Sequence, residues 1–143
     1  MAEVKVDPET GEVSLLSFVT AHDVGTIINP TSHQGQIEGG IVMGLGFGLM
    51  EELVADEGRI TTPSMGEFKI PNIKDVPRLK TVLLQEPIGP VPYQGKAIGE
   101  NSIGPVAGAI ANAVYDAVGV RITDLPITAE KVYWAMKERR SSP

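Results

Sequence analysis

The residue best suited to chemistry in this sequence is Glu100, which lies in the stretch GKAIGENSIGPVAGAIANA at residues 95–113. No other charged side chain follows Lys96 in that stretch, and a run of small residues typical of a closely packed helix comes next. A carboxylate with few polar neighbours suits general-base catalysis, in which it takes a proton from a reacting group. The start of the following helix favours the charged form of such a carboxylate. From the residues alone, a capping or surface role for Glu100 is the alternative.

Other residue types that carry out catalysis are present, but they follow no recognisable arrangement. His22 precedes Asp23, His33 lies in a polar segment, and no G-x-S-x-G nucleophile motif occurs. We therefore expect turn or capping roles for both histidines rather than a catalytic triad or a metal site. The glycine-rich segments match neither a P-loop nor a dinucleotide fingerprint. An anionic group would nevertheless suit the helix N-termini near these segments.

The composition excludes several classes of protein. The 143 residues are 42% hydrophobic and carry a net charge of −6, which fits one folded domain and argues against nucleic-acid binding. The absence of cysteine excludes disulfides and thiolate-bound metal clusters within these residues. The longest apolar run, IVMGLGFGLM, is about half the length of a membrane span. The charged first residues lack the pattern of a signal peptide. We accordingly expect a cytoplasmic protein with no membrane partner.

The spacing of apolar and turn-forming residues predicts interleaved strands and helices. A helix from Ser32 or Gln34 to Val54 would carry its apolar side chains on an i, i+4 row. Each glycine inside it costs about 1 kcal/mol relative to alanine, so we expect this helix to pack closely against another element. The other predicted elements are a hairpin with strands at 3–6 and 12–21, strands at 59–61 and 81–86, an extended non-helical segment at 87–95, a helix at 104–118, a strand at 120–122 and a helix at 128–139 with Thr128 as its N-cap. The expected fold class is α+β, with a hairpin and short strands packed against about three helices in one domain over residues 1–143.

Several runs of residues resemble one enzyme family. GQIEGGIVMGLGFGLMEEL and KAIGENSIGPVAGAIANAVYDAVGVRITDLPITAEKV are similar to the C-terminal end of the molybdenum-cofactor subunit of molybdenum hydroxylases, the family of xanthine dehydrogenase and aldehyde oxidase. AHDVGTIINP and the hairpin before it look like the segments that precede these runs in the family. The resemblance covers nearly the whole chain in the family's order. It implies that residues 1–143 are the C-terminal portion of a molybdopterin-binding domain.

The resemblance also implies a reaction. Enzymes of this family hydroxylate aldehydes or electron-poor N-heterocycles with oxygen that comes from water. The electrons leave through a molybdenum–pterin cofactor, either molybdopterin or its dinucleotide form, to Fe–S clusters and often FAD on other domains or subunits. The pterin dithiolene holds the metal, so no metal ligand is expected from this chain. The expected enzyme is an oxidoreductase that acts on a small-molecule substrate.

The family's required Glu corresponds to Glu100, which would take the proton from the molybdenum-bound hydroxyl as this group attacks the substrate carbon. The G-Q-x-E-G segment at 35–39 would lie on the cofactor, with a hydrogen bond from Gln36, whereas Glu38 would serve the structure. The expected site therefore has Glu100 as its catalytic residue and, against the cofactor, Gly35, Gln36, Gly39, Gly99, Asn101 and Ser102.

The sequence departs from the family in two respects. Many members follow the Glu with two prolines or other small residues, whereas Asn101 and Ser102 follow it here. The family's upstream loops, which face the oxo group and hold the substrate, have no counterpart in this chain. We expect a piece of a subunit, either a shortened form or one product of a split subunit, that turns over only with the remainder of the molybdenum-binding subunit and its Fe–S and FAD partners. The alternative is an assembly or interaction module that kept the fold and lost turnover.

Overall fold

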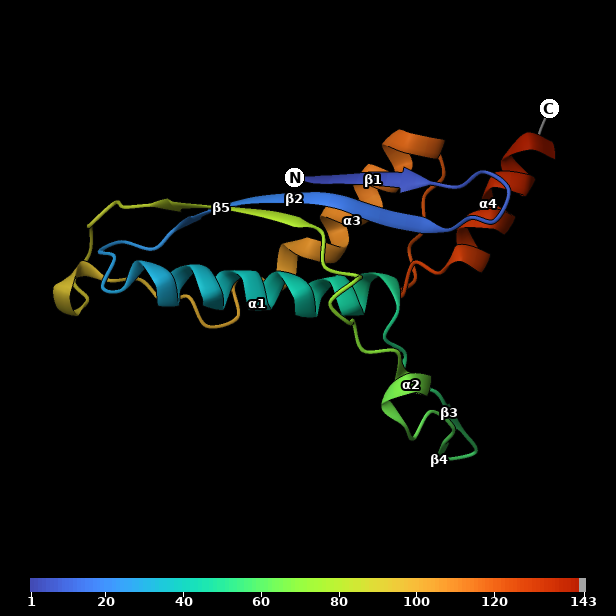
Figure 1. Cartoon of the computed structure of the whole chain (residues 1–143), viewed down its shortest axis with the longest axis horizontal. Helices are drawn as coiled ribbons and strands as arrows, with labels where there is room; N and C mark the ends of the chain where they lie inside the picture. The colour runs from blue at the N-terminus through green and yellow to red at the C-terminus, as the bar shows by residue number, and fades with distance from the viewer. Residues whose placement is uncertain (142–143) are drawn as a thin grey trace.

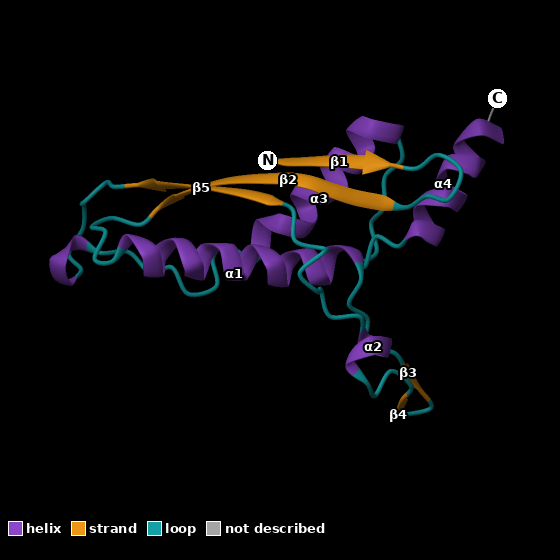
Figure 2. Cartoon of the chain, in the orientation of Figure 1, coloured by secondary structure: helices purple, strands orange, loops and turns teal. Residues whose placement is uncertain are grey.

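The computed structural model describes residues 1–141 and consists of a three-stranded sheet packed against long helices (Figures 1 and 2). The elements are β1 (Ala2–Val6), β2 (Val13–Asp23), α1 (Pro30–Leu49), β3 (Ala55–Asp56), β4 (Arg59–Ile60), α2 (Met65–Phe68), β5 (Arg78–Leu84), a 3-10 turn (Pro92–Gln94), α3 (Gly104–Val118) and α4 (Ala129–Ser141). This confirms the α+β fold class, with the short α2 added to the three long helices that we expected. Among the described residues, no helix is both long and apolar enough to cross a membrane.

The sheet has the order β1-β2-β5, and its parallel half determines where the loops lie. The predicted hairpin forms β1 and β2, and Asp7 stabilises its turn by accepting the backbone N–H of Glu9 at 2.8 Å. β5, predicted at 81–86, pairs in parallel with β2 so that Asp23 lies opposite Leu84. Because parallel strands end at the same edge of a sheet, the segments that lead from β2 to α1 and from β5 toward α3 leave the sheet side by side.

Helix α1 ends before Val54, so the predicted length of this helix is wrong. Two backbone N–H groups just after Leu49 both donate to the Gly46 carbonyl, which closes the last turn. Leu53, the next member of the predicted apolar row, is 63% exposed and therefore has no core contact that would extend the helix. At the other end, the Asn29 side chain caps the helix, which begins slightly earlier than predicted.

The glycines of α1 allow the close packing that we expected. Gly40, Gly44 and Gly48 are buried and follow one another at one-turn spacing along the side of α1 that faces α3 and the residues before it. A Cβ atom on Gly44 would lie 2.6 Å from the Cβ of Val106, which is closer than real carbon atoms approach. The glycine row therefore lets α3 and the segment before it lie directly on the backbone of α1.

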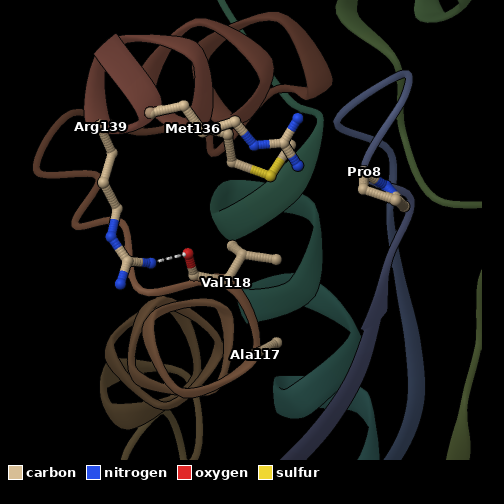
Figure 3. Close-up of a pocket in the computed structure, with 6 residues that line it drawn as sticks. Pro8, Ala117, Val118, Met136 and Arg139 are labelled. Carbon is tan, nitrogen blue, oxygen red and sulfur yellow. Dashed lines mark hydrogen bonds between the residues drawn. The ribbon is translucent and has the colours of Figure 1, made fainter. Parts of the chain in front are cut away.

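Helices α3 and α4 begin and end close to the predicted residues. Gly119 adopts a φ of 68° just after α3, as expected for a residue that terminates a helix. Arg139 of α4 donates a hydrogen bond of 2.6 Å to the Val118 carbonyl at the same helix end (Figure 3). Thr128 accepts the backbone N–H of Lys131 at 3.3 Å, which confirms its predicted role as the N-cap of α4.

Two local predictions between these elements are wrong. Residues 120–122 do not form a strand, because Val120 is buried in the core while the Arg121 side chain turns back to donate 2.7 Å to Asn112 Oδ1 on α3. The segment predicted as extended at 87–95 contains a 3-10 turn, in which Tyr93 has a φ of 53°. The contact between Arg121 and Asn112 joins residues nine positions apart, and the 3-10 turn involves only three residues. A local sequence pattern reveals neither feature.

A small projection extends away from the sheet and the long helices. We call residues 52–70, which include β3, β4 and α2, the arm (Figure 1, lower right). The predicted strand at 59–61 forms here as β4 and pairs with β3. Nearly all arm residues are exposed, and Met65 has 71% of its surface accessible. The arm therefore adds little to the core beside which the candidate site lies.

Candidate functional site

The fold brings the two halves of the predicted site together beside the N-terminal half of α1. We call residues 97–103, which precede α3, the Glu100 loop. The Nε2 amide of Gln36 donates a hydrogen bond of 2.6 Å to the Gly99 carbonyl, although 63 positions separate the two residues. The segment that contains this loop runs next to α1 before it enters α3 (Figure 1). Two segments that were singled out separately in the sequence are therefore neighbours in space.

A second contact follows one helical turn farther along α1. Ser102 is 1% exposed and lies against Gly40, where any side chain would collide with the Ser102 hydroxyl. That hydroxyl has no hydrogen-bond partner within residues 1–141. Buried hydroxyl groups normally find a partner. Ser102 is therefore a buried hydroxyl without a partner among the described residues, packed on the backbone of α1.

The surface beside Gln36 consists largely of bare backbone. Gly35 and Gly39 on α1 are exposed, and a Cβ atom added to either would meet no heavy atom within 4 Å. The same holds for Gly99 on the loop. Another group can therefore approach the backbone closely at each of these glycines.

Glu100 lies at the exposed surface of the loop, and its backbone carbonyl accepts the N–H of Ile103 at 3.1 Å. Within residues 1–141, its carboxylate makes no hydrogen bond or ion pair. The next residue, Asn101, donates from its side chain to the Ala97 carbonyl at 3.4 Å, which closes the loop on itself. The carboxylate is thus presented by a short loop that has its own internal bonds.

An ion pair that the sequence did not predict anchors the start of this segment. Lys96 contacts the Asp23 carboxylate at the end of β2, and the Lys96 backbone N–H donates 3.0 Å to the Val24 carbonyl. The hydrogen bond from Lys96, together with the backbone N–H of Gly25, lowers the pKa of Asp23 below its ordinary value. The sequence indicated only that Lys96 is the last cation before Glu100, and this does not identify Asp23 as the partner of Lys96.

Both histidines have local partners; His33 lies in the first turn of α1 next to its cap, whereas His22 lies within β2, so the turn or capping role expected for His22 is wrong. The Nε2 atom of His22 lies 2.7 Å from the Thr20 hydroxyl on the same strand, and burial lowers the pKa of His22. The Nδ1 atom of His33 lies 2.8 Å from the Asn29 carbonyl in the first turn of α1. Within residues 1–141, no three His, Asp or Glu side chains are grouped as metal ligands.

Comparison with known proteins places this chain in a family. A sequence model of the molybdopterin cofactor-binding domain matches residues 1–77, which include Gln36. The putative xanthine dehydrogenase molybdenum-binding subunit XdhA of Escherichia coli (strain K12) is 36% identical over 133 residues, which are 92% of this chain and 18% of that protein. The aldehyde oxidoreductase molybdenum-binding subunit PaoC of the same strain is 37% identical over 134 residues, which are 91% of this chain and 18% of that protein.

A solved structure agrees with these sequence matches. The crystal structure of quinoline 2-oxidoreductase from Pseudomonas putida 86 superposes with a TM-score of 0.89 and 34% identity, over 94% of this chain and 18% of that one. The chain belongs to the molybdopterin cofactor-binding domain family. It is similar to part of the molybdenum-binding subunits of xanthine dehydrogenases and aldehyde oxidoreductases, which confirms the resemblance seen in the sequence. It spans 18% of the length of these relatives.

Proposed function

We propose that this chain is the part of a molybdenum hydroxylase that supplies the catalytic base and one wall of the pterin site. The observation that carries the proposal is the hydrogen bond from Gln36 to Gly99, which joins the cofactor-wall segment to the loop of the base at 2.6 Å. The overall reaction would oxidise an aldehyde or an N-heterocycle with oxygen from water. The bound molybdenum–pterin group would supply the redox chemistry, because no side chain of this chain can take up two electrons.

Each residue of the site would have a distinct task. Glu100 would accept the proton of the water-derived nucleophile as the new carbon–oxygen bond forms, which is typical work for a carboxylate base. Its carboxylate is free of competing partners within residues 1–141, which supports this role. The pterin would lie along the bare backbone next to the Gln36 amide. The residues that we propose for this wall are Gly35, Gln36, Gly39, Gly99, Asn101 and Ser102.

The chain would act together with further protein. We propose that residues 1–143 form the C-terminal portion of a molybdopterin-binding domain, and that the remainder of the molybdenum-binding subunit completes the site. The outward side of α1 supports this, since Met43 is 53% and Phe47 is 48% exposed on the same helix as Gln36. Domains or subunits with Fe–S clusters and FAD would then receive the electrons. A small substrate would bind between Glu100 and the cofactor.

The alternative is a module for assembly or interaction without turnover. The exposed apolar residues of the arm, such as Ile60 and Met65, favour a role in protein contacts whether or not catalysis occurs. The free carboxylate of Glu100 supports the catalytic proposal, because a general base needs a carboxylate without competing partners. Purification with the remainder of a molybdenum-binding subunit, followed by measurement of molybdenum, separates the two.

The sharpest test of the catalytic proposal is Glu100→Gln in the assembled enzyme. Loss of a general base lowers turnover by about 10²- to 10⁴-fold, so we expect kcat to fall by this amount while the molybdenum content stays unchanged. Asp116→Asn is the matched control, because Asp116 is an exposed carboxylate on α3 outside the proposed site. Full activity of Glu100→Gln in an enzyme that holds molybdenum would contradict the assignment of the base.

A further inference from the structure

Helix α1 holds the Glu100 loop at two points, one on each side of the carboxylate. Gln36 bonds to Gly99 just before Glu100, and Gly40 receives Ser102 shortly after it. We propose that Gln36 is a positioning residue for Glu100, which sets the place of the carboxylate by fixing Gly99 against α1. This inference rests on the proposed catalytic role of Glu100, and it adds a task for Gln36 besides contact with the cofactor.

The other bonds of the loop do not place it relative to α1. Ile103 donates to the Glu100 carbonyl at 3.1 Å, and Asn101 donates to Ala97 at 3.4 Å, so both bonds stay within the loop. Among the described residues, the Gln36 side chain makes the one hydrogen bond that joins the loop to α1. Without it, no hydrogen bond ties the loop to α1, so the turn that the Ile103 N–H closes opens more readily while Ser102 still rests on Gly40.

Gly40 supplies the second constraint, which acts through shape. Because it has no side chain, the Ser102 hydroxyl and the loop backbone can lie on the helix surface. Gly40 thereby sets how closely the loop approaches α1 at Ser102, after Glu100 in the chain. Gln36 fixes the loop at Gly99, before Glu100. Gly39 is the natural comparison, because it is adjacent in the sequence and a Cβ atom added to it would meet no heavy atom within 4 Å.

The bond to Gly99 uses only part of the Gln36 amide. One N–H is donated to the Gly99 carbonyl, which leaves the Oε1 atom and the second N–H for a ligand. The two tasks of Gln36 can therefore be separated by substitution. Gln36→Met removes both the donor and the acceptor, whereas Gln36→Lys keeps a donor for Gly99 and removes the Oε1 acceptor.

Hydrogen exchange in the whole chain tests the proposal without requiring activity. We measure the exchange rate of the Ile103 amide, which reports on the Glu100 loop, and that of the Val114 amide in the middle of α3. A single neutral hydrogen bond is worth about 0.5–1.5 kcal/mol, so Gln36→Met should speed exchange at Ile103 by about 2- to 12-fold and leave Val114 unchanged. Gln36→Lys should restore most of the protection.

Two matched controls accompany this measurement. Gln34→Met removes a side-chain hydrogen bond of 2.7 Å to Glu38 on the same helix and should leave Ile103 at its original rate. Gly40→Ala should speed exchange in the loop, whereas Gly39→Ala should not. Equal rates at Ile103 in Gln36→Met and Gln34→Met would overturn the proposal, as would faster exchange of Ile103 and Val114 by the same factor.

The assembled enzyme provides a second readout that separates this proposal from that of the base. Gln36→Met should lower kcat, and Gln36→Lys should recover part of it at equal molybdenum content. Glu100→Gln should leave the exchange of Ile103 unchanged, because the side chain of Glu100 has no partner in the loop. If the exchange results hold but Glu100→Gln is fully active, the catalytic role fails while the positioning of the loop stands. If Gln36→Met leaves exchange at Ile103 unaltered, the positioning role fails regardless of the result for Glu100.

Discussion

The Glu100 loop and the arm both lack long regular elements, yet the fold holds them in different ways. Gln36 and Gly40 attach the loop to α1 from across the sequence. By contrast, the hydrogen bonds that the arm makes within the described residues all stay inside it, such as the capping box between Ser64 and Glu67. The arm also projects away from the helices that the loop lies against (Figure 1).

This difference indicates which of the two irregular segments can hold a reacting side chain in a fixed position. A side chain that takes part in a reaction must be held closely, and long-range contacts restrict a loop more than local turns do. The arm instead exposes apolar side chains, which suits contact with further protein. We therefore expect substitutions on the buried side of α1 to have large effects on stability and similar substitutions in the arm to have small ones.

The largest contrast is expected for two members of the same apolar row in the sequence. Ile41 is fully buried on α1, so Ile41→Ala should lower the free energy of unfolding by about 2–5 kcal/mol. Leu53→Ala in the arm should change it by less than about 0.5 kcal/mol, because this side chain is 63% exposed. Urea unfolding of both variants measures the difference. Similar losses would mean that the arm packs against the core in solution.

A smaller contrast is expected for two glycines. A Cβ on Gly44 would lie 2.6 Å from the Val106 Cβ and 2.9 Å from the Ile103 carbonyl, so Gly44→Ala should destabilise by about 1–3 kcal/mol. Gly66 in α2 faces open space, and Gly66→Ala should be neutral or stabilise by up to about 1 kcal/mol. Thermal unfolding followed by circular dichroism compares the two. A tolerated Gly44→Ala would show that α1 and α3 can separate without loss.

The smallest effects are expected from two carboxylates whose pKa values shift in opposite directions. The pKa of Asp23 lies below 3.8 because Lys96 donates to it, and the pKa of Glu51 lies above 4.5 because of burial. The contribution of Asp23 to stability is therefore present above pH 3.8 and is lost as the pH falls through its lowered pKa. The contribution of Glu51 is complete below pH 4.5 and is lost as the pH rises through its raised pKa.

Urea unfolding at a series of pH values checks these signs. At neutral pH, Asp23→Asn should be less stable than the original chain, and the difference should shrink in acid. Glu51→Gln should be slightly more stable at neutral pH, and this gain should disappear in acid. A difference that grows in acid for Asp23→Asn would contradict the stabilising ion pair with Lys96.

Much of the helical structure followed from local patterns. The limits of α3 were predictable because Gly119 suits a left-handed residue after a helix, and the start of α4 was predictable from Thr128. The end of α1 was not, since the apolar row continues in the sequence to Leu53 after the supporting core has ended. The absent strand at 120–122 has a similar cause, because local propensity does not reveal whether a neighbouring strand exists.

For the site, residue types and local spacing identified the candidate residues and the family that they resemble. The lone Glu100 in a glycine-rich loop and the G-Q-x-E-G segment were visible in one dimension, because residue type and local spacing carry that information. Three contacts became known from the fold alone: Gln36 reaches Gly99, Ser102 lies on Gly40, and Lys96 pairs with Asp23. The physical reason is the parallel pairing of β2 with β5, which brings segments far apart in the chain to one edge of the sheet.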